Sequence, residues 1–386
     1  MERKHLIVFV HGVMGSRIDT AYASKQICER YPEMEVVINE NSLMVDGVDC
    51  CGLRLAQEIY DHIVDLHLSR SIVISHFSIF GHSMGGIIAR FAIGILDRQD
   101  IFKNITLMSY TSFASPHLGA YIPHNAWYGY AINNMMKRAG SPTTDQITFS
   151  DTFRDGKPLF EILADPEYEF YTALSKFKYR RSYANTMGDF NVAYYTSALD
   201  SFDYFDDSNM EITCDPEYPS IITKFDKIKP VQHKTTAIRL LFAIAICASV
   251  PIFVTWSKIK HWRVHNEILL KYKDEQDGYY SIHIDQEKGA FLFRERQKNE
   301  KEIIQEPKFK GLFNPLPGPN LKSRMDYELK CLPVQLKILK NLKQLPWDIV
   351  LVRINSLKSH RMIMGMDNDI QEGQDVIRHF VDTFAF

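Results

Sequence analysis

The five residues Gly81-His82-Ser83-Met84-Gly85 have the pattern Gly-x-Ser-x-Gly. The apolar stretch 71–80 before them is typical of a buried strand, and the stretch 86–96 after them is typical of a helix. A serine on such a sharp strand-to-helix turn is strained and exposed, so its hydroxyl can attack a carbonyl carbon. Side chains at Gly81 and Gly85 would collide with the neighbouring strand and helix. We therefore predict that Ser83 is a nucleophile and that His82 packs behind it.

The segment His11-Gly12-Val13-Met14-Gly15 follows a strand-like apolar run, 6–10, and resembles the oxyanion loop of lipases. Attack on an ester builds negative charge on the carbonyl oxygen, and each backbone N–H aimed at that oxygen lowers the barrier by roughly 3 kcal/mol. We predict that the backbone N–H groups of Val13 and Met84 bind this oxyanion. His11 and Gly12 are expected to support the loop.

The composition is that of a globular protein with one main domain. The chain has 386 residues, of which 45% are hydrophobic, and a formal net charge of −2. It can bury a large core and has no surplus of positive charge, so nucleic acid is not an expected partner. The six cysteines show no CxxC pair or other metal-ligand spacing, which predicts reduced thiols and no metal site. The N-terminus is too short in apolar residues for a signal peptide and is expected to form the first strand, with the catalytic part in the cytosol.

Stretches typical of strands and helices alternate along the chain, which favours a mostly parallel sheet covered by helices, an α/β fold. Helical spacing of apolar residues predicts a helix over 46–68, before the strand that leads to Ser83. Further strands are expected at 105–110, 181–184 and 347–354, and an amphipathic helix around 376–380 closes the chain. The Tyr-rich excursion 120–180 is expected to form a cap over the site, by analogy with hydrolases of this type.

A resemblance to a known family is carried by the C-terminal tail from residue 345 and by four sequence blocks, which are 5–15, 46–59, 80–96 with 113–119, and 183–197. The chain resembles the DUF676 family of serine esterases, which are lipase-like α/β-hydrolases. The resemblance implies an α/β-hydrolase fold and hydrolysis of lipid esters by a Ser-Asp-His triad, without a metal or an organic cofactor. It also implies that His11 and His117 shape the pocket.

The chain order of this fold requires the acid after the nucleophile and the histidine near the C-terminus. Asp189 is the first candidate for the acid, because it lies in a polar loop just after the predicted strand 181–184. The family has a Val-Pro pair after this aspartate, and Ala193 stands here in place of the proline. Asp200 and Asp203 therefore stay open as alternatives.

Only two of the fourteen histidines, His360 and His379, lie in the C-terminal segment where the base is expected. His360 follows the alternating apolar run 347–354, so it is expected on a loop after the last strand of the core. His379 lies in the predicted closing helix, where a histidine on the helix surface is the simpler interpretation. We predict that His360 is the base, that Asp189 orients it, and that it takes the proton of Ser83.

The segment 240–256 has seventeen residues without a charge and is flanked by Lys and Arg on both sides. Its length is at the lower limit of the about 17 to 25 residues that cross a bilayer. Because Ser83 and Asp189 precede the segment and His360 follows it, one full crossing would separate the base from the nucleophile. Pro251 can kink a helix here. We therefore expect an interfacial or re-entrant helix that binds a lipid-droplet surface or the cytosolic leaflet of a membrane, with a core helix as the alternative.

These expectations divide the chain into four parts. The hydrolase core spans 1–236, the hydrophobic segment 237–256, a charged insert with a Pro-rich connection 257–323, and the remainder of the core, with the base, 324–386. Within the insert, 279–284 and 290–293 are expected to form a hairpin.

The predicted function is hydrolysis of the carboxylic esters of glycerophospholipids or acylglycerols at a lipid surface. Three alternatives stay open: a monoacylglycerol lipase, an acyl-protein thioesterase, and a scaffold that keeps the hydrolase fold on a lipid surface without turnover. Acyl-chain length and headgroup are determined by the shape of the pocket, so the sequence does not separate the substrates.

Overall fold

The computed structural model describes residues 1–12, 15–40, 46–121, 133–134, 141–205, 210–227, 262–273, 279–294, 328–366 and 371–384. Its strands are β1 (Glu2–Val10), β2 (Glu35–Ile38), β3 (Ile72–His82), β4 (Thr106–Phe113), β5 (Tyr179–Asn185), β6 (Met210–Cys214), β7 (Ile221–Lys227) and β8 (Asp348–Val352). They form one sheet in the order β2-β1-β3-β4-β5-β8-β7-β6. In this sheet order, the neighbouring strands β2, β1, β3, β4, β5 and β8 are all parallel, and β7 and β6 follow as antiparallel strands at the edge. The mostly parallel sheet confirms the predicted fold class.

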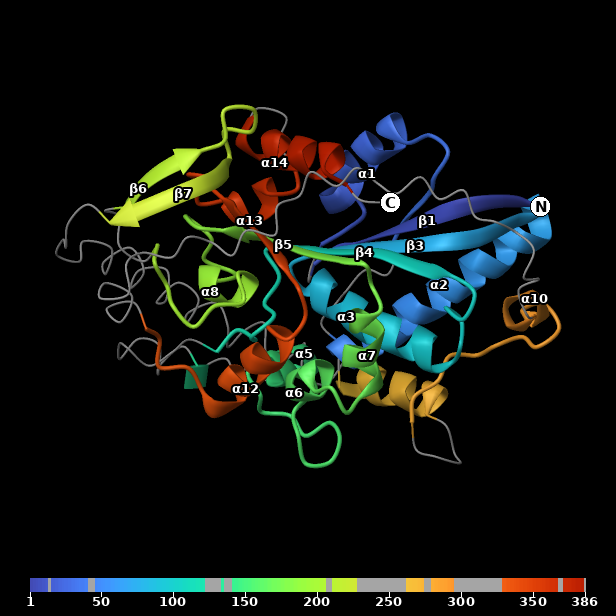
Figure 1. Cartoon of the computed structure of the whole chain (residues 1–386). Coiled ribbons are helices and arrows are strands. Elements are labelled where there is room, and N and C mark those ends of the chain that lie inside the picture. Colours follow the sequence, from blue (N-terminus) through green and yellow to red (C-terminus); the bar gives the residue numbers. More distant parts are fainter. Residues whose placement is uncertain are drawn as a thin grey trace.

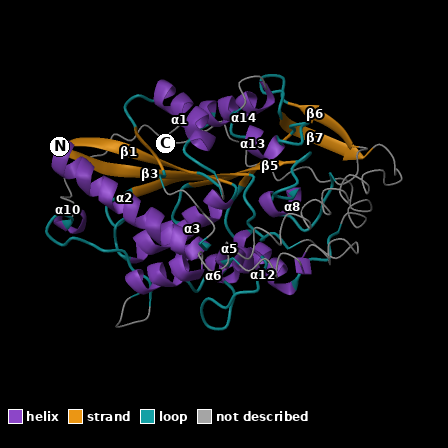
Figure 2. Cartoon of the chain, turned by 180° about the vertical axis from the view of Figure 1, so that it is seen from behind, coloured by secondary structure: helices purple, strands orange, loops and turns teal. Residues whose placement is uncertain are grey.

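Helices cover both faces of the sheet. They are α1 (Ile18–Arg30), α2 (Val48–Arg70), α3 (Met84–Arg98), α5 (Pro142–Ile147), α6 (Leu159–Ala164), α7 (Glu169–Ser175), α8 (Tyr194–Ser197), α10 (Ala290–Phe293), α12 (Pro333–Leu342), α13 (Ser359–Met362) and α14 (Gln371–Asp382). α1, α13 and α14 lie on one face, and α2, α3, α6, α7 and α12 lie on the other (Figure 1 and Figure 2).

The strand β1 shows why the sequence reads as a continuous apolar run. Leu6, Val8 and Val10 join the core beneath α2 and α3, whereas Ile7 and Phe9 join the core beneath α1 and α14. Successive side chains of a strand point to opposite faces, and a parallel sheet is buried on both of them. Alternation between apolar and polar residues is therefore lost in the central strands.

The helix that carries the predicted nucleophile at its start is buried on all sides. Every residue of α3 from Met84 to Leu96 is buried, and the helix packs between β3, α2 and α7. A helix that is apolar around its whole circumference is typical of this position. The tight packing fixes the turn at Ser83 relative to the sheet.

Most predicted elements fall within observed ones, but several observed elements were not predicted. The runs 6–10, 71–80, 105–110, 181–184 and 347–354 lie in β1, β3, β4, β5 and β8, apart from residues at their ends. Among the elements that were not predicted from the sequence are α1, β2 and the β6–β7 hairpin. β2 has only four residues, and all four are partly exposed, so no strong periodic pattern marks it.

The described part of the excursion 120–180 is built into the core. Its helices α5, α6 and α7 bury their apolar side chains in the same core as α2 and α3. Residues 122–132 and 135–140 lie outside the described residues. A cap over the site stays a prediction.

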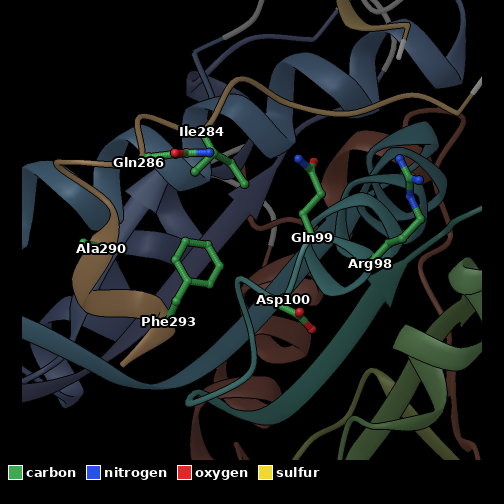
Figure 3. A pocket seen from close by; sticks show the side chains of 7 residues that line it. All are labelled: Arg98, Gln99, Asp100, Ile284, Gln286, Ala290 and Phe293. Atoms are coloured by element: carbon green, nitrogen blue, oxygen red, sulfur yellow. The ribbon is translucent and has the colours of Figure 1, made fainter. Parts of the chain in front are cut away.

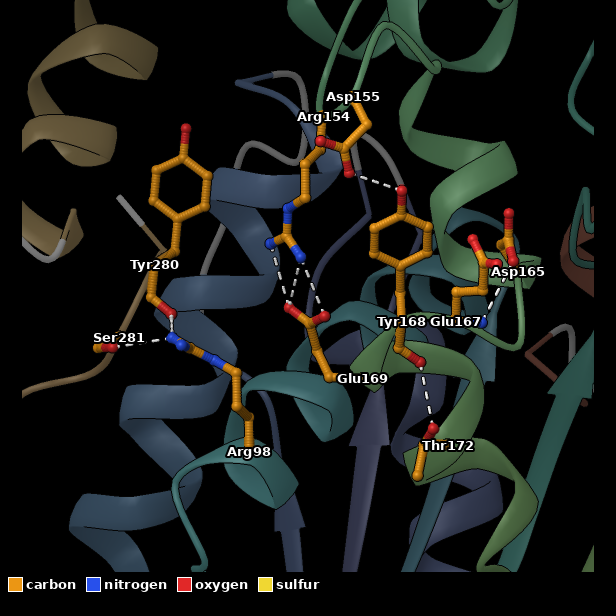
Figure 4. Close-up of polar contacts among 10 residues, drawn as sticks. All are labelled: Arg98, Arg154, Asp155, Asp165, Glu167, Tyr168, Glu169, Thr172, Tyr280 and Ser281. Atoms are coloured by element: carbon orange, nitrogen blue, oxygen red, sulfur yellow. Dashed lines mark hydrogen bonds and ion pairs between the residues drawn. The ribbon is translucent and has the colours of Figure 1, made fainter. Parts of the chain in front are cut away.

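The predicted hairpin of 279–284 and 290–293 is wrong. Residues 290–293 form the short helix α10, after a turn at 286–289, and 281–284 belong to no strand among the described residues. We call the segment 279–294 the strap. It lies along α2 and past the end of α3. The Arg98 side chain of α3 donates to the Tyr280 carbonyl and to Ser281 Oγ, beside the Arg154–Glu169 ion pair (Figure 4).

Two glutamine side chains replace the missing partner strand. Gln99 Oε1 accepts from the Ile282 N–H at 2.8 Å, and Gln99 Nε2 donates to the Ile282 carbonyl at 3.1 Å. Gln57 forms the same pair of bonds with the N–H and carbonyl of His283, at 2.9 and 3.1 Å. A side-chain amide carries one donor and one acceptor group, as a backbone peptide does, so the strap needs no second strand.

The apolar segment 240–256 lies outside the described residues, so its helix and its lipid association stay predictions. Among the helices that are described, none is long and apolar enough to cross a membrane. A helix over 262–272 follows the segment. His265 in this helix lies with Nε2 3.1 Å from Asp49 Oδ2, in the first turn of α2, and both side chains are buried. This contact fixes the helix to the core.

Candidate active site

Ser83 occupies the turn between the last residue of β3 and the first residue of α3. Its φ is +55° and its ψ is −130°, a backbone conformation that residues other than glycine rarely adopt. A Cβ on Gly81 would lie 2.3 Å from the backbone of Gly86, and a Cβ on Gly85 would lie 2.3 Å from the Val10 carbonyl oxygen. The two glycines are therefore required by close backbone contacts, as the sequence pattern predicted.

The structure brings Ser83, His360 and Asp189 together. His360 Nε2 lies 2.9 Å from Ser83 Oγ, and His360 Nδ1 lies 2.9 Å from Asp189 Oδ2. The Asp189 side chain is only 2% exposed and the His360 side chain 11%. Ser83 and Asp189 come from the turn after β3 and the loop after β5, where the carboxyl ends of parallel strands meet. His360 also follows its strand, β8, but it lies in the single-turn helix α13 and not on a loop as predicted.

The carboxylate of Asp189 is held on both oxygens. Oδ1 accepts the backbone N–H groups of Asn191 and Val192 at 3.0 and 2.9 Å, and Oδ2 accepts from Asn185 Nδ2 at 3.3 Å as well as from His360. An ionised carboxylate can only accept, so Nδ1 of His360 must donate. Nε2 is then the unprotonated nitrogen, and it can accept the hydroxyl proton of Ser83.

The alternative site residues lie in other environments. Asp200 Oδ1 accepts from the Ser201 N–H at 2.8 Å, and Asp203 Oδ1 accepts from the Phe205 N–H at 3.3 Å. Both ring nitrogens of His360 are already bonded to Asp189 and Ser83. His379 lies on α14 and contacts the Tyr183 hydroxyl through Nδ1 at 2.9 Å, and burial, together with Arg181, lowers its pKa to about 3.

Part of the predicted oxyanion site can be placed. A Cβ on Gly12 would lie 2.7 Å from Ser83 Cβ, so the loop after β1 passes directly against the nucleophile. Met84 is the first residue of α3, where backbone N–H groups have no partner within the helix. Val13 lies outside the described residues. His11 is buried and contacts the Gly12 carbonyl through Nδ1 at 3.0 Å.

His117 and His82 are both buried, but they differ in what they contact. His117 Nε2 lies 2.8 Å from Ser112 Oγ, and burial lowers the pKa of His117 well below its usual range. His82 Nε2 lies 2.7 Å from the backbone carbonyl of His360. This contact, and the bond from Asn185 Nδ2 to the Ser359 carbonyl at 3.1 Å, were missed by sequence reasoning. Asn185 does lie in the resemblance block 183–197, which is the only signal that marked it.

One group of potential metal ligands occurs among the described residues. Donor atoms of Asp49, Cys50 and His265 lie within 4.8 Å of one another, and all three residues are buried. Burial raises the pKa of the Cys50 thiol far above its usual range, so it remains protonated and donates to the His265 carbonyl at 3.4 Å. The ion pair of His265 with Asp49 accounts for the other contacts, so we interpret the group as structural.

A surface pocket lies away from the triad, between the end of α3 and the strap (Figure 3). Its volume is about 560 Å³. None of the residues discussed above as nucleophile, acid or base lines it. The lining residues are Arg98, Gln99, Asp100, Ile284, Gln286, Ala290 and Phe293.

Three features together define an α/β-hydrolase. They are a mostly parallel sheet with helices on both faces, a Gly-x-Ser-x-Gly turn after a central strand, and the chain order Ser83, Asp189, His360. The family model described as "Putative serine esterase (DUF676)" matches residues 1–201. The chain belongs to this family.

Curated relatives match about half of the chain. "Putative lipase ROG1" of Saccharomyces cerevisiae is 29% identical over 217 residues, which cover 53% of this chain and 30% of that protein. "Putative lipase C4A8.10" of Schizosaccharomyces pombe is 26% identical over 211 residues, which cover 52% of this chain and 26% of that protein. The matched region is thus less than a third of each relative.

Solved structures of lipolytic enzymes show a partial likeness. Phospholipase PlaB from Legionella pneumophila has 14% identity and a TM-score of 0.32, over 48% of this chain and 39% of that chain. Aspergillus fumigatus lipase B has 13% identity and a TM-score of 0.32, over 47% of this chain and 38% of that chain.

Proposed function

We propose that this protein is a serine hydrolase that cleaves the carboxylic esters of lipids. The observation that carries the proposal is the pair of 2.9 Å contacts that joins Ser83 Oγ through the His360 ring to Asp189. Membership in a family of serine esterases and the relatives named as lipases support an ester as the substrate.

The geometry supports a two-step reaction. His360 Nε2 takes the hydroxyl proton as Ser83 Oγ attacks the ester carbonyl, and the Asp189 carboxylate stabilises the imidazolium that forms. The Met84 N–H, with that of Val13 as the expected second donor, binds the oxyanion. His360 then donates its proton to the leaving alcohol. Water, activated by the same imidazole, hydrolyses the acyl-serine and regenerates Ser83.

The lipid class of the substrate rests on the apolar segment 240–256. We propose that this segment binds the surface of a lipid droplet or the cytosolic leaflet of a membrane without crossing it. Its seventeen uncharged residues between basic flanks support this. The anchored helix 262–272, in contact with α2 through His265 and Asp49, would hold the C-terminal end of the segment close to the hydrolase core.

The experiment that tests the reaction is fatty-acid release from emulsions of a phospholipid, a diacylglycerol and a monoacylglycerol, and from an acyl-cysteine thioester. Wild-type protein is compared with Ser83→Ala. We expect release from at least one glycerolipid that disappears in the variant. Equal signals from both proteins would refute the proposal and favour a scaffold, and release from the thioester alone would identify a thioesterase.

The experiment that tests the anchor is flotation with lipid-droplet-like emulsions. Deletion of 240–256 should move the protein from the floating to the soluble fraction while cleavage of a short-chain, water-soluble ester is retained. Deletion of 295–311, which has the same length and lies in the charged insert, is the matched control and should still float. If both deletions float like the wild type, the assignment of the anchor is wrong.

A further inference from the structure

The carbonyl oxygen of His360 lacks the partner that a regular helix would give it. α13 is a single turn. The Met364 N–H, which would reach the His360 carbonyl in a longer helix, donates to the Arg361 carbonyl at 3.2 Å. A buried carbonyl at a helix end needs another donor, because water does not reach it. His82 supplies this donor, since its Nε2 lies 2.7 Å from the His360 carbonyl oxygen.

The contact defines the protonation state of His82. A carbonyl oxygen can only accept, so Nε2 of His82 must carry the proton. The other ring nitrogen, Nδ1, is buried and has no partner among the described residues. Burial, and the neighbouring His360 ring, lower the pKa of His82 to about 3. His82 is therefore a neutral donor at neutral pH.

A neutral ring is the suitable donor at this place. The ring centroids of His82 and His360 lie 4.9 Å apart. A positive charge at that distance would oppose proton uptake by His360, which the reaction requires. The His82 ring can thus hold the backbone of the base without weakening its basicity.

We propose that His82 is a positioning residue, which holds the backbone of His360 so that Nε2 of the imidazole stays in line with Ser83 Oγ. The inference rests on the proposed function, because the position of the base matters only when Ser83 is a nucleophile. His82 does not touch the reacting atoms. It joins the nucleophile turn directly to the base, across 278 positions of sequence.

The test compares two variants, His82→Gln and His82→Met, whose new side chains are similar in length and shape. The glutamine amide can place an N–H donor near the position of His82 Nε2, whereas methionine cannot donate. We expect His82→Met to lower kcat for a short-chain ester roughly 10- to 100-fold, with KM within about twofold, because misplacement of a catalytic group by about 1 Å can cost 10²-fold. His82→Gln should keep kcat within about threefold of the wild type. The reaction rate of Ser83 with a fluorophosphonate should follow the same order.

A double-mutant cycle separates positioning from packing. In a His360→Ala background there is no imidazole to align, so His82→Met should change the residual rate less than about twofold. An equal loss in both backgrounds, or equal losses for the glutamine and methionine variants, would overturn the positioning role. So would a fully active His82→Met. If the wild type neither cleaves esters nor reacts with the fluorophosphonate, the proposed function fails, and the role of His82 fails with it.

Discussion

Replacement of Asp189 by asparagine is expected to reverse the hydrogen bonding of the base. Asp189 Oδ1 accepts two backbone N–H groups, from Asn191 and Val192, and Oδ2 accepts from His360 Nδ1 at 2.9 Å. An asparagine keeps its amide oxygen on the two N–H groups, so its NH₂ group faces His360. The imidazole must then accept at Nδ1 and carry its proton on Nε2. That is the atom which has to take the proton of Ser83.

The expected loss in kcat is about 10³- to 10⁴-fold. A unit negative charge about 4 Å from the centre of the imidazolium, at an effective dielectric constant of about 20, stabilises it by about 4 kcal/mol. This corresponds to roughly 10³-fold in rate. The wrong tautomer adds to the loss, and in a Ser-His-Asp protease the same substitution lowers kcat about 10⁴-fold for this reason.

The assay is hydrolysis of a short-chain p-nitrophenyl ester, with kcat and KM measured for each variant. Asp200→Asn and Asp203→Asn are the matched controls, because these aspartates accept backbone N–H groups of their own turns. Both controls should keep kcat within about threefold of the wild type, by the usual size of substitutions away from a reacting group. If Asp189→Asn keeps more than a tenth of the wild-type kcat, or if Asp200→Asn shows the larger loss, the assignment of the acid is refuted.

Three further predictions concern the framework of the protein. Gly85→Ala should lower both Tm and kcat, because the new Cβ would lie 2.3 Å from the Val10 carbonyl oxygen. Thermal unfolding and ester hydrolysis measure the two effects. The control is Gly156→Ala, because Gly156 has a positive φ but nothing lies within 4 Å of the new Cβ; it should lower Tm only slightly and leave kcat unchanged. Burial by itself would lower the pKa of His265, but the hydrogen bond and charge of Asp49 outweigh burial and raise it. A raised pKa in the folded state means that the ion pair contributes fully to stability below the usual pKa of 6.5, and that this contribution is lost as the pH rises through the folded pKa. The free energies of urea unfolding of wild type and Asp49→Asn should therefore differ more at pH 6 than at pH 9. The opposite trend would contradict the pairing. Gln99→Leu should lower the free energy of unfolding by about 1 to 3 kcal/mol, because it leaves the Ile282 backbone groups without these partners. It should leave kcat unchanged. An unaltered free energy of unfolding would show that the strap does not depend on the two bonds between Gln99 and Ile282.

The turn that carries the proposed nucleophile could be predicted because its structural requirements are local. The strand before Ser83, the helix after it and the two glycines that allow the turn all lie in one short stretch of sequence. The close contacts at Gly81 and Gly85 are made with the neighbouring backbone, as the motif requires. Each of these signals depends on residue types and spacing alone.

The proposed acid and base are a different case, because their selection depends on contacts between distant residues. His360 and Asp189 are separated by 171 positions, and His360 and Ser83 by 277. Chain order, the position of a polar loop after a predicted strand and the family resemblance together reduced the candidates to three aspartates and two histidines. Only the folded structure shows that Asp189 and His360 meet at Ser83.

The strap shows why other features could not be predicted. An extended segment has the same apolar alternation whether its backbone pairs with a strand or with side chains. Gln57 lies on α2, and Gln99 directly follows α3. Both residues pair with the strap from more than 180 positions earlier in the chain, and they give no local signal of this role. The same holds for the bond from His82 to the base.

The structure also explains why His360, the proposed base, is the residue that needs side-chain support. Backbone pairing continues past the strand ends, with the Ser83 N–H bonded to the Phe113 carbonyl, that of Ala114 to Tyr183, and that of Thr186 to Val352. These bonds fix the turn at Ser83 and the start of the acid loop relative to the sheet.

The distance of each residue from its strand decides how much this pairing can do. Ser83 directly follows β3, which ends at His82, and Asp189 lies four residues after β5, which ends at Asn185. His360 lies eight residues after β8, which ends at Val352, so the backbone hydrogen bonds between the strands do not extend to it. The carbonyls of Ser359 and His360 are the ones that accept side-chain donors, from Asn185 and His82. Both donors are anchored at strand ends, so they extend the rigidity of the sheet to the residue that is farthest from it.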